Sequence, residues 1–162
     1  MVASGGVSFP ELGATNFGHK IAKQFGIRTT PLSPALTNFT LPNLLINKTR
    51  DLSGISLDVD LTCNGHNFRE NILFTHTGLG GPAVMQATLY WNSGDPIIIN
   101  LVPDVDVYKW IKEEKGLQSH AKLKNVLTKF FPEKFARFFC ELKFDSDIPI
   151  SKISGKDLKD FC

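Results

Sequence analysis

The sequence predicts an α+β protein, in which a mainly β part with two helices is followed by an all-helical part that begins near residue 104. Apolar and polar residues alternate from 55 to 63, and the pair Asn64-Gly65 then leads into a returning run over 66–74, which is typical of a β-hairpin with one buried face. After Pro103, apolar residues recur three and four positions apart, which is the spacing of amphipathic helices. The 162 residues are enough for one ordinary domain or two small subdomains.

The first part of the chain, residues 1–26, is predicted to contain the end of a strand, a glycine loop and a short helix over 16–25. Thr15 can cap this helix and Gly26 can end it. Residues 27–50 then contain three prolines, Pro31, Pro34 and Pro42. The prolines predict brief strands and irregular connections in this stretch rather than helix.

The main body of the β part is assigned to residues 27–103. Its clearest elements are two strands over 55–63 and 66–74, joined by the Asn64-Gly65 turn. A glycine loop follows at 78–81, and Pro82 is well placed as the first residue of a helix that reaches Leu89. A further strand is expected over 97–101.

The helical subdomain is assigned to residues 104–162. We expect one helix over about 104–115 and a second over about 119–131, with Ser119 as its N-cap. A third begins at Pro132, and a fourth begins near Ser154. Because the fourth helix is cut short at Cys162, we expect the chain to be a piece of a longer polypeptide.

Composition excludes several classes of function. The net charge is +2, from 18 basic and 16 acidic residues, which is too balanced to imply a nucleic-acid partner. No apolar run approaches the roughly 20 residues needed to span a bilayer, and the N-terminus does not resemble a signal peptide. The three cysteines, Cys63, Cys140 and Cys162, are interpreted as reduced thiols of a cytoplasmic protein.

Two adjacent glycines, Gly5 and Gly6, precede the first helix. Without a Cβ atom the main chain can lie close to a ligand, and this position suits the phosphate or sugar groups of a dinucleotide. A tight turn that uses glycine for its positive φ is the plainer interpretation of the same residues. The dinucleotide fingerprint Gly-x-Gly-x-x-Gly is absent.

The run Ala3–Thr15 resembles a signature of the BaiN/YhiN-type NAD(P)/FAD-dependent oxidoreductases, which reads approximately Ala-Thr-Gly-Gly-x-Ser-Tyr-Pro-x-x-Gly-Ser-Thr-Gly. Phe74–Gln86 looks like the second hallmark of that family, and residues 31–36 and 99–104 fit in the expected order. Several positions depart from the pattern, namely Ser4, Phe9, Asn16, Phe17 and Gly80. The changes at Asn16 and Phe17 weaken any inference that this turn makes a polar contact with a cofactor.

The resemblance implies a Rossmann-type FAD domain interrupted by a long insert. Residues 1–26 would be a remnant of the FAD domain. A small β-barrel-like antiparallel subdomain, residues 27–103, followed by an all-helical subdomain, residues 104–162, would form the insert, which would shape the substrate or cofactor entrance. Ala3, Ser4, Gly5 and Gly6 would line the flavin, whereas Gly78–Pro82 would fix a tight turn into a helix.

The resemblance also implies cofactors and partners. FAD, with NAD(P)H as co-substrate, is expected in the intact parent, and neither is expected in this piece, which would be inactive alone. The expected partner is the remaining FAD-binding domain of the same polypeptide, together with a small-molecule substrate of unknown identity.

No catalytic residue and no metal site is predicted. Cys63-x-x-His66 has a metal-like spacing, but it straddles the hairpin turn and lacks a second pair of ligands. An alternative function is a stand-alone module that binds nucleic acid or protein through a basic stripe on the helices. The stripe comprises Lys122, Lys124, Lys129, Lys134, Arg137 and Lys143. A solvated face whose lysines shield the Phe-rich side is the favoured interpretation of this stripe, so nucleic acid is an unexpected partner.

Overall fold

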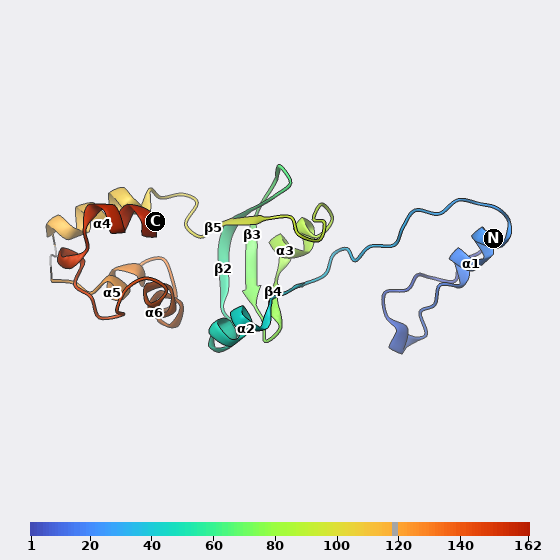
Figure 1. The fold of residues 1–162 in the computed structure, drawn as a ribbon, viewed down its shortest axis with the longest axis horizontal. Helices are drawn as coiled ribbons and strands as arrows, with labels where there is room; N and C mark the ends of the chain where they lie inside the picture. The colour runs from blue at the N-terminus through green and yellow to red at the C-terminus, as the bar shows by residue number, and fades with distance from the viewer. Residues whose placement is uncertain (118–119) are drawn as a thin grey trace. The chain divides into compact units, whose positions relative to one another are not determined.

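The computed structural model describes residues 1–117 and 120–162, which form two compact units, Met1–Ser33 and Pro34–Cys162 (Figure 1). The first unit contains a 3-10 helix, η1 (Pro10–Leu12), and one α-helix, α1 (Phe17–Gln24). The strand end expected in residues 1–13 is not formed, because this stretch is a loop and the 3-10 turn. The helix expected over 16–25 is present as α1, and Gly26 follows it with φ +70°.

The second unit contains an antiparallel sheet of five strands in the order β1-β4-β3-β2-β5, curled into a half-barrel. The strands are β1 (Phe39–Thr40), β2 (Ser56–Cys63), β3 (His66–Phe74), β4 (Gly78–Gly80) and β5 (Ile97–Asn100). The predicted hairpin is confirmed, with Asn64 and Gly65 at φ 48° and 78°, as a type I′ turn requires. The α+β fold class predicted from the sequence is therefore confirmed.

Buried and outward-facing residues alternate along β2, and the buried ones contribute to the barrel core. Leu57, Val59, Leu61 and Cys63 are buried, and the polar residues between them face outward. Helix α3 (Pro82–Ala87) covers the buried face with side chains that include Val84, and its first residue is the proline that the sequence placed there.

Two predictions about the barrel are wrong. Residues 27–50 were expected to lack helix, but α2 (Asn43–Thr49) and η2 (Arg50–Leu52) lie there. Pro42 is the N-cap of α2, so it precedes the hydrogen-bonded turns and cannot break them. The glycine stretch 78–81 was expected to be a loop, yet its first three residues form β4. Its glycines permit a close approach of the backbone to residues 38–41.

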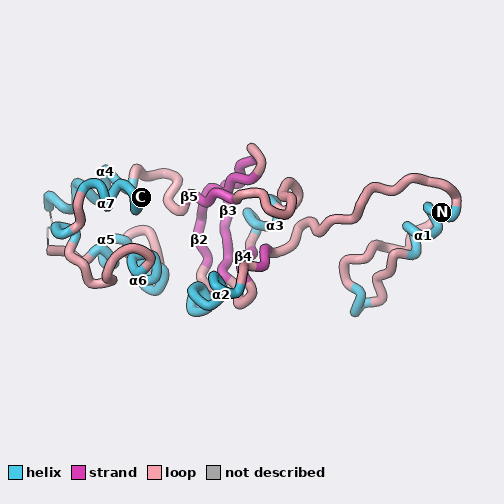
Figure 2. The backbone as a smooth tube through the Cα atoms, in the orientation of Figure 1, coloured by secondary structure: helices cyan, strands magenta, loops and turns pink. Residues whose placement is uncertain are grey.

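Helices and loops make up the part of the second unit that follows β5 (Figure 2). The four expected helices correspond to α4 (Val107–Leu117), α5 (Leu123–Leu127), α6 (Glu133–Glu141) and α7 (Gly155–Phe161), with η3 (Ile150–Lys152) before the last. The second helix is shorter than predicted and its N-cap is Lys122, whereas the predicted cap Ser119 lies outside the described residues. Ser154 caps α7 as expected, since its hydroxyl accepts a hydrogen bond from the Asp157 amide at 3.1 Å.

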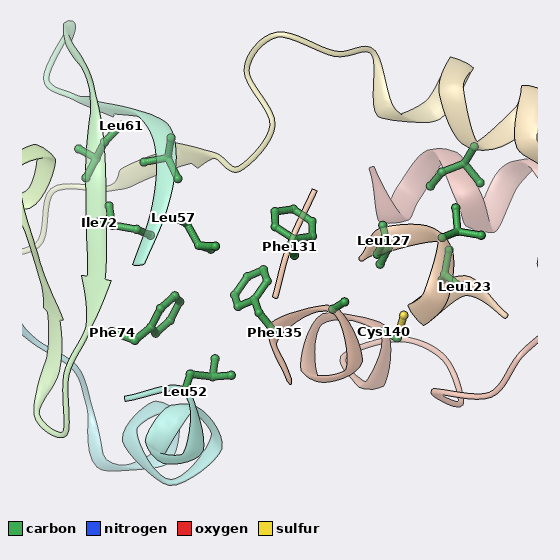
Figure 3. Close-up of a cluster of buried hydrophobic side chains, with 14 of the residues drawn as sticks. Leu52, Leu57, Leu61, Ile72, Phe74, Leu123, Leu127, Phe131, Phe135 and Cys140 are labelled. Carbon is green, nitrogen blue, oxygen red and sulfur yellow. The ribbon is translucent and has the colours of Figure 1, made fainter. Parts of the chain in front are cut away.

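A cluster of phenylalanines holds the helical part against the barrel. Phe135 on α6 is 2% exposed, and its ring centroid lies 5.6 Å from that of Phe74 on β3 and 5.0 Å from that of Phe131 (Figure 3). Buried residues of both parts therefore form one continuous apolar core.

Candidate functional site

The predicted cofactor residues, Ala3, Ser4, Gly5 and Gly6, form an exposed loop before η1. Within the described part of the chain, the backbone of this loop makes no hydrogen bond, so its polar groups are available to a ligand. Gly5 has φ +71°, and a Cβ atom added at Gly5 or Gly6 would meet no atom within 4 Å. The glycines therefore fill no gap in the first unit, and they leave bare main chain on its surface.

Gly18 brings α1 close to this loop. A Cβ atom at Gly18 would lie 3.3 Å from the Ser4 Oγ, which is tighter than ordinary packing allows. The Ser4 side chain therefore rests on the first turn of α1. The hydroxyl of Thr15 accepts a hydrogen bond from the Phe17 amide at 3.4 Å, just before Asn16 caps the helix.

The glycines of the second motif, at 78, 80 and 81, are needed for close packing of the backbone. A Cβ atom at Gly78 would overlap the carbonyl oxygen of Phe39, and one at Gly80 would lie 2.6 Å from the Asn38 side chain. The Thr75 hydroxyl accepts a hydrogen bond from the Gly78 amide at 3.0 Å, which shapes the turn between β3 and β4. These contacts account for the glycines by packing, and they leave His76 exposed in the same turn.

Most cations of the predicted basic stripe are already paired. Asp147 lies 3.1 Å from the Lys122 Nζ and 2.7 Å from the Lys124 Nζ. Lys129 lies 2.8 Å from a carboxylate oxygen of the buried Glu114, and Lys143 is 3.9 Å from Asp160. The local field of the stripe is therefore weak, as expected for a face of solvated ion pairs.

The three thiols lie in different environments. Cys63 and Cys140 are buried and Cys162 is exposed. Desolvation by burial raises the pKa of Cys140 to about 12, and it also raises the pKa values of Cys63 and Cys162. Since the thiolate is the reactive form, all three are poor nucleophiles at neutral pH.

His66, the other half of the Cys63-x-x-His66 spacing, stacks on Tyr90 with ring centroids 3.7 Å apart. Among the residues that the structure describes, no three His, Cys, Asp or Glu side chains gather in a way that could hold a metal ion. No helix in the described ranges is both long and apolar enough to cross a membrane.

One hollow of the second unit has a volume of about 620 Å³. It lies beside β5 and the connection from β5 to α4, and apolar side chains such as Val102, Phe131 and Phe161 line most of it. Lys159 contributes a charged group to its wall. None of the four predicted cofactor residues lines this hollow.

A family model described as the HI0933-like protein barrel and H2TH domain matches residues 33–162. The chain belongs to that family. It is the HI0933/YhiN-type family of FAD-dependent oxidoreductases, whose signature motifs the two glycine motifs of this chain resemble. The HI0933-like match begins at residue 33, and the second compact unit begins at Pro34.

Two relatives of this HI0933-like chain are each named ribosomal RNA dihydrouridine synthase. The protein from Escherichia coli is 39% identical over 158 residues, which cover 97% of this chain and 40% of the relative. The protein from Haemophilus influenzae is 39% identical over 165 residues, which cover 99% and 41%. The chain thus spans about two fifths of the length of the curated relatives it matches, and the similarity includes the first unit.

Proposed function

We propose that this chain is the barrel and helical region of a flavin-dependent enzyme that reduces uridine to dihydrouridine in ribosomal RNA. FAD would be held mainly by polypeptide outside these residues, and the chain alone would be inactive. The observation that carries the proposal is the 39% identity to two proteins of that name over nearly the whole chain.

The first unit supports the need for further polypeptide. It contains no buried residue, and Phe17, Phe25 and Ile27 are 51%, 72% and 62% exposed. A unit with no buried residue gains little of the apolar burial that stabilises a fold, so these side chains are available for contact with further polypeptide. We assign these exposed apolar side chains to contact with the FAD-binding domain.

The loop Ala3–Gly6 fits a flavin in one respect. Its main chain is exposed, is free of hydrogen bonds to the described residues, and has no Cβ atom at two successive positions. These properties allow close contact with a planar ring or a phosphate group. The loop does not enclose a ligand by itself, so the rest of the site would come from the FAD-binding domain.

Reduction of a uridine requires a hydride at C6 and a proton at C5 of the uracil ring, with the loss of the C5=C6 double bond. When bound, FAD would supply the hydride that it receives from NAD(P)H. A base within folded RNA must leave its stack to reach such a site. We propose that the barrel and helices shape the entrance through which the base passes and exclude water from it.

The alternative function, a stand-alone module that binds nucleic acid or protein through the basic stripe, has weaker support. Four of the six cations in the stripe have carboxylate partners. The word RNA in the names of the relatives favours an RNA contact, but within an enzyme rather than in a separate module.

The test uses the complete product of the gene that encodes these residues, beside the 162-residue chain alone. We expect a yellow complete product that restores dihydrouridine to ribosomal RNA in a strain lacking the gene, as measured by mass spectrometry of nucleosides. The 162-residue chain should be colourless and inactive. A complete product that never takes up flavin, or a short chain that is active alone, would contradict the proposal.

A further inference from the structure

Six lysines of the helical part differ from the four lysines of the basic stripe that have carboxylate partners. In the ranges that the structure describes, none of them forms an ion pair. They lie on α4, η3 and α7, and we call them the α4–α7 lysine face: Lys109, Lys112, Lys115, Lys152, Lys156 and Lys159.

Contacts between α4 and the segment that begins α7 bring the two groups of lysines together. The Lys115 Nζ donates a hydrogen bond to the carbonyl oxygen of Ile153 at 2.8 Å. A Cβ atom at Gly155 would lie 4.0 Å from the Tyr108 hydroxyl. The two segments are therefore side by side, as their neighbouring labels in Figure 2 indicate.

The spacing along α4 keeps its lysines on one broad face. Lys109, Lys112 and Lys115 are three residues apart, and residues at this spacing are neighbours on a helix surface. Lys109 and Lys112 are exposed, as are Lys152 and Lys156. Long side chains at these positions can reach an extended polyanion without moving the backbone.

Acidic residues near the face are few or already bonded. Asp157 accepts a hydrogen bond from the Ser154 hydroxyl at 2.7 Å, and Asp160 lies 3.9 Å from Lys143. Glu113 is the remaining exposed carboxylate of α4 and sits one turn after Lys109. Asp106, which directly precedes α4, is a fourth carboxylate: it lines the same hollow as Lys159 and accepts a hydrogen bond from the Lys109 amide at 2.9 Å. Six cations against these four carboxylates leave a positive excess.

We propose that the α4–α7 lysine face binds the phosphate backbone of the ribosomal RNA substrate. This inference rests on the proposed function and names the surface that holds its substrate. Lysine is depleted from protein–protein interfaces, whereas unpaired lysines supply the sequence-independent part of nucleic-acid binding. Such contacts orient a folded RNA by its shape, and they leave selection of the uridine to the reactive site.

The test compares two triple variants of the complete gene product. The first is Lys112→Gln/Lys152→Gln/Lys156→Gln, on the face. The matched control is Lys122→Gln/Lys124→Gln/Lys143→Gln, which changes the net charge equally but removes lysines that already have carboxylate partners. Fluorescence anisotropy measures binding of unmodified ribosomal RNA, transcribed in vitro, at a series of salt concentrations.

If the three lysines contact phosphates, we expect the face variant to lose on the order of 100-fold in affinity at about 0.1 M salt. The slope of log affinity against log salt concentration should be smaller in magnitude by about 2 to 3. The control should change by less than about threefold, because its cations are neutralised before RNA arrives. Flavin content, measured on the same samples, should be equal in all three proteins.

Several results would overturn the inference. Wild-type affinity in the face variant would do so, as would equal losses in both variants, since the cause would then be total charge. Competition by polyglutamate as effective as that by RNA would assign the face to an acidic protein. Failure of the wild-type protein to bind RNA would also overturn it. If RNA binding depends on the face but no dihydrouridine forms, the proposed enzyme function is wrong, whereas the assignment of the lysine face to RNA binding is kept.

Discussion

A Cβ atom added at Gly81 would lie 2.7 Å from the carbonyl oxygen of Asn71, so the start of α3 and strand β3 touch through bare main chain. Gly81 also has φ +94° and ψ 167°, a conformation that residues with a side chain rarely adopt. Two independent requirements for glycine therefore coincide at the residue that directs α3 onto the sheet.

The substitution Gly81→Ala should destabilise the protein by about 3 kcal/mol or more, because it adds backbone strain to a steric overlap. Gly116→Ala is the control, since Gly116 lies within α4 and its added Cβ would meet nothing within 4 Å. That change should stabilise the protein by about 0.5 kcal/mol. Urea unfolding, followed by the fluorescence of Trp91 and Trp110, measures both.

Removal of the Phe135 ring should separate the helical part from the barrel. Phe135→Ala is expected to cost about 3–5 kcal/mol, because the ring is buried against Phe74 and Phe131. Leu117→Ala, at a residue 79% exposed, should cost almost nothing. Equal unfolding midpoints for the two variants would mean that the Phe135 contacts do not stabilise the core.

Side chains at Gly5 and Gly6 should impair flavin binding without affecting the second unit. For Gly5→Val/Gly6→Val in the complete gene product, we expect at least about tenfold weaker flavin retention, because two Cβ atoms would separate the main chain from the cofactor. The unfolding midpoint of the second unit should not change. Normal flavin content would leave these glycines as turn residues only.

Thiol labelling should distinguish the cysteines. In the folded protein a thiol reagent at about pH 8 should modify Cys162 slowly and leave Cys63 and Cys140 intact, because burial raises the pKa of each and blocks access to the latter two. All three should react after unfolding in urea. Rapid modification of Cys140 in the native state would show that α6 opens readily.

Acid should weaken the contact between the hairpin turn at Asn64 and the loop before β5, which contains Asp95. The Asn64 side chain donates a hydrogen bond to Asp95 at 2.6 Å, and the Asn92 amide and side chain donate two more, which together lower the pKa of Asp95. The folded pKa lies below the unfolded value, about 3.9, so this stabilisation is present above pH 4 and is lost as pH falls through the folded pKa.

The midpoint of thermal unfolding, measured between about pH 2 and 5, tests this sign. Asp58 and Asp147 also have lowered pKa values and contribute to the same acid limb. The informative quantity is therefore the difference between the wild type and Asp95→Asn, which should shrink as the pH falls. A difference that does not vary with pH would assign the effect of the substitution to geometry rather than charge.

Local signals in the sequence predicted the elements that local chemistry determines. The Asn64-Gly65 turn, the helix that begins at Pro82 and the cap at Ser154 were all found in this way. Helix α2 is absent from the prediction because prolines argue against helix in a sequence pattern, although Pro42 lies at the N-cap of α2, where proline is tolerated. Strand β4 was missed because its glycines are explained by contacts with residues about 40 positions earlier.

The candidate site was less predictable, because charge pairing depends on tertiary contacts. The sequence could not show that Lys122 and Lys124 share Asp147, which follows them by more than 20 residues. The unpaired lysines of α4 carried a visible signal, their spacing of three, but they stood outside the stretch where cations outnumbered acids. The assignment of Ala3–Gly6 to a flavin stays a prediction.

Strand β1 has a mechanical consequence. It is the first strand after the connection from residues 1–33, and only two residue pairs, Phe39 with Leu79 and Thr40 with Gly78, join it to β4. The β2–β3 ladder has eight such pairs. Tension on that connection would therefore separate β1 from β4 while the β2–β3 hairpin remained intact. The half-barrel would open first between these two short strands, where β4 contributes Gly78 and Gly80.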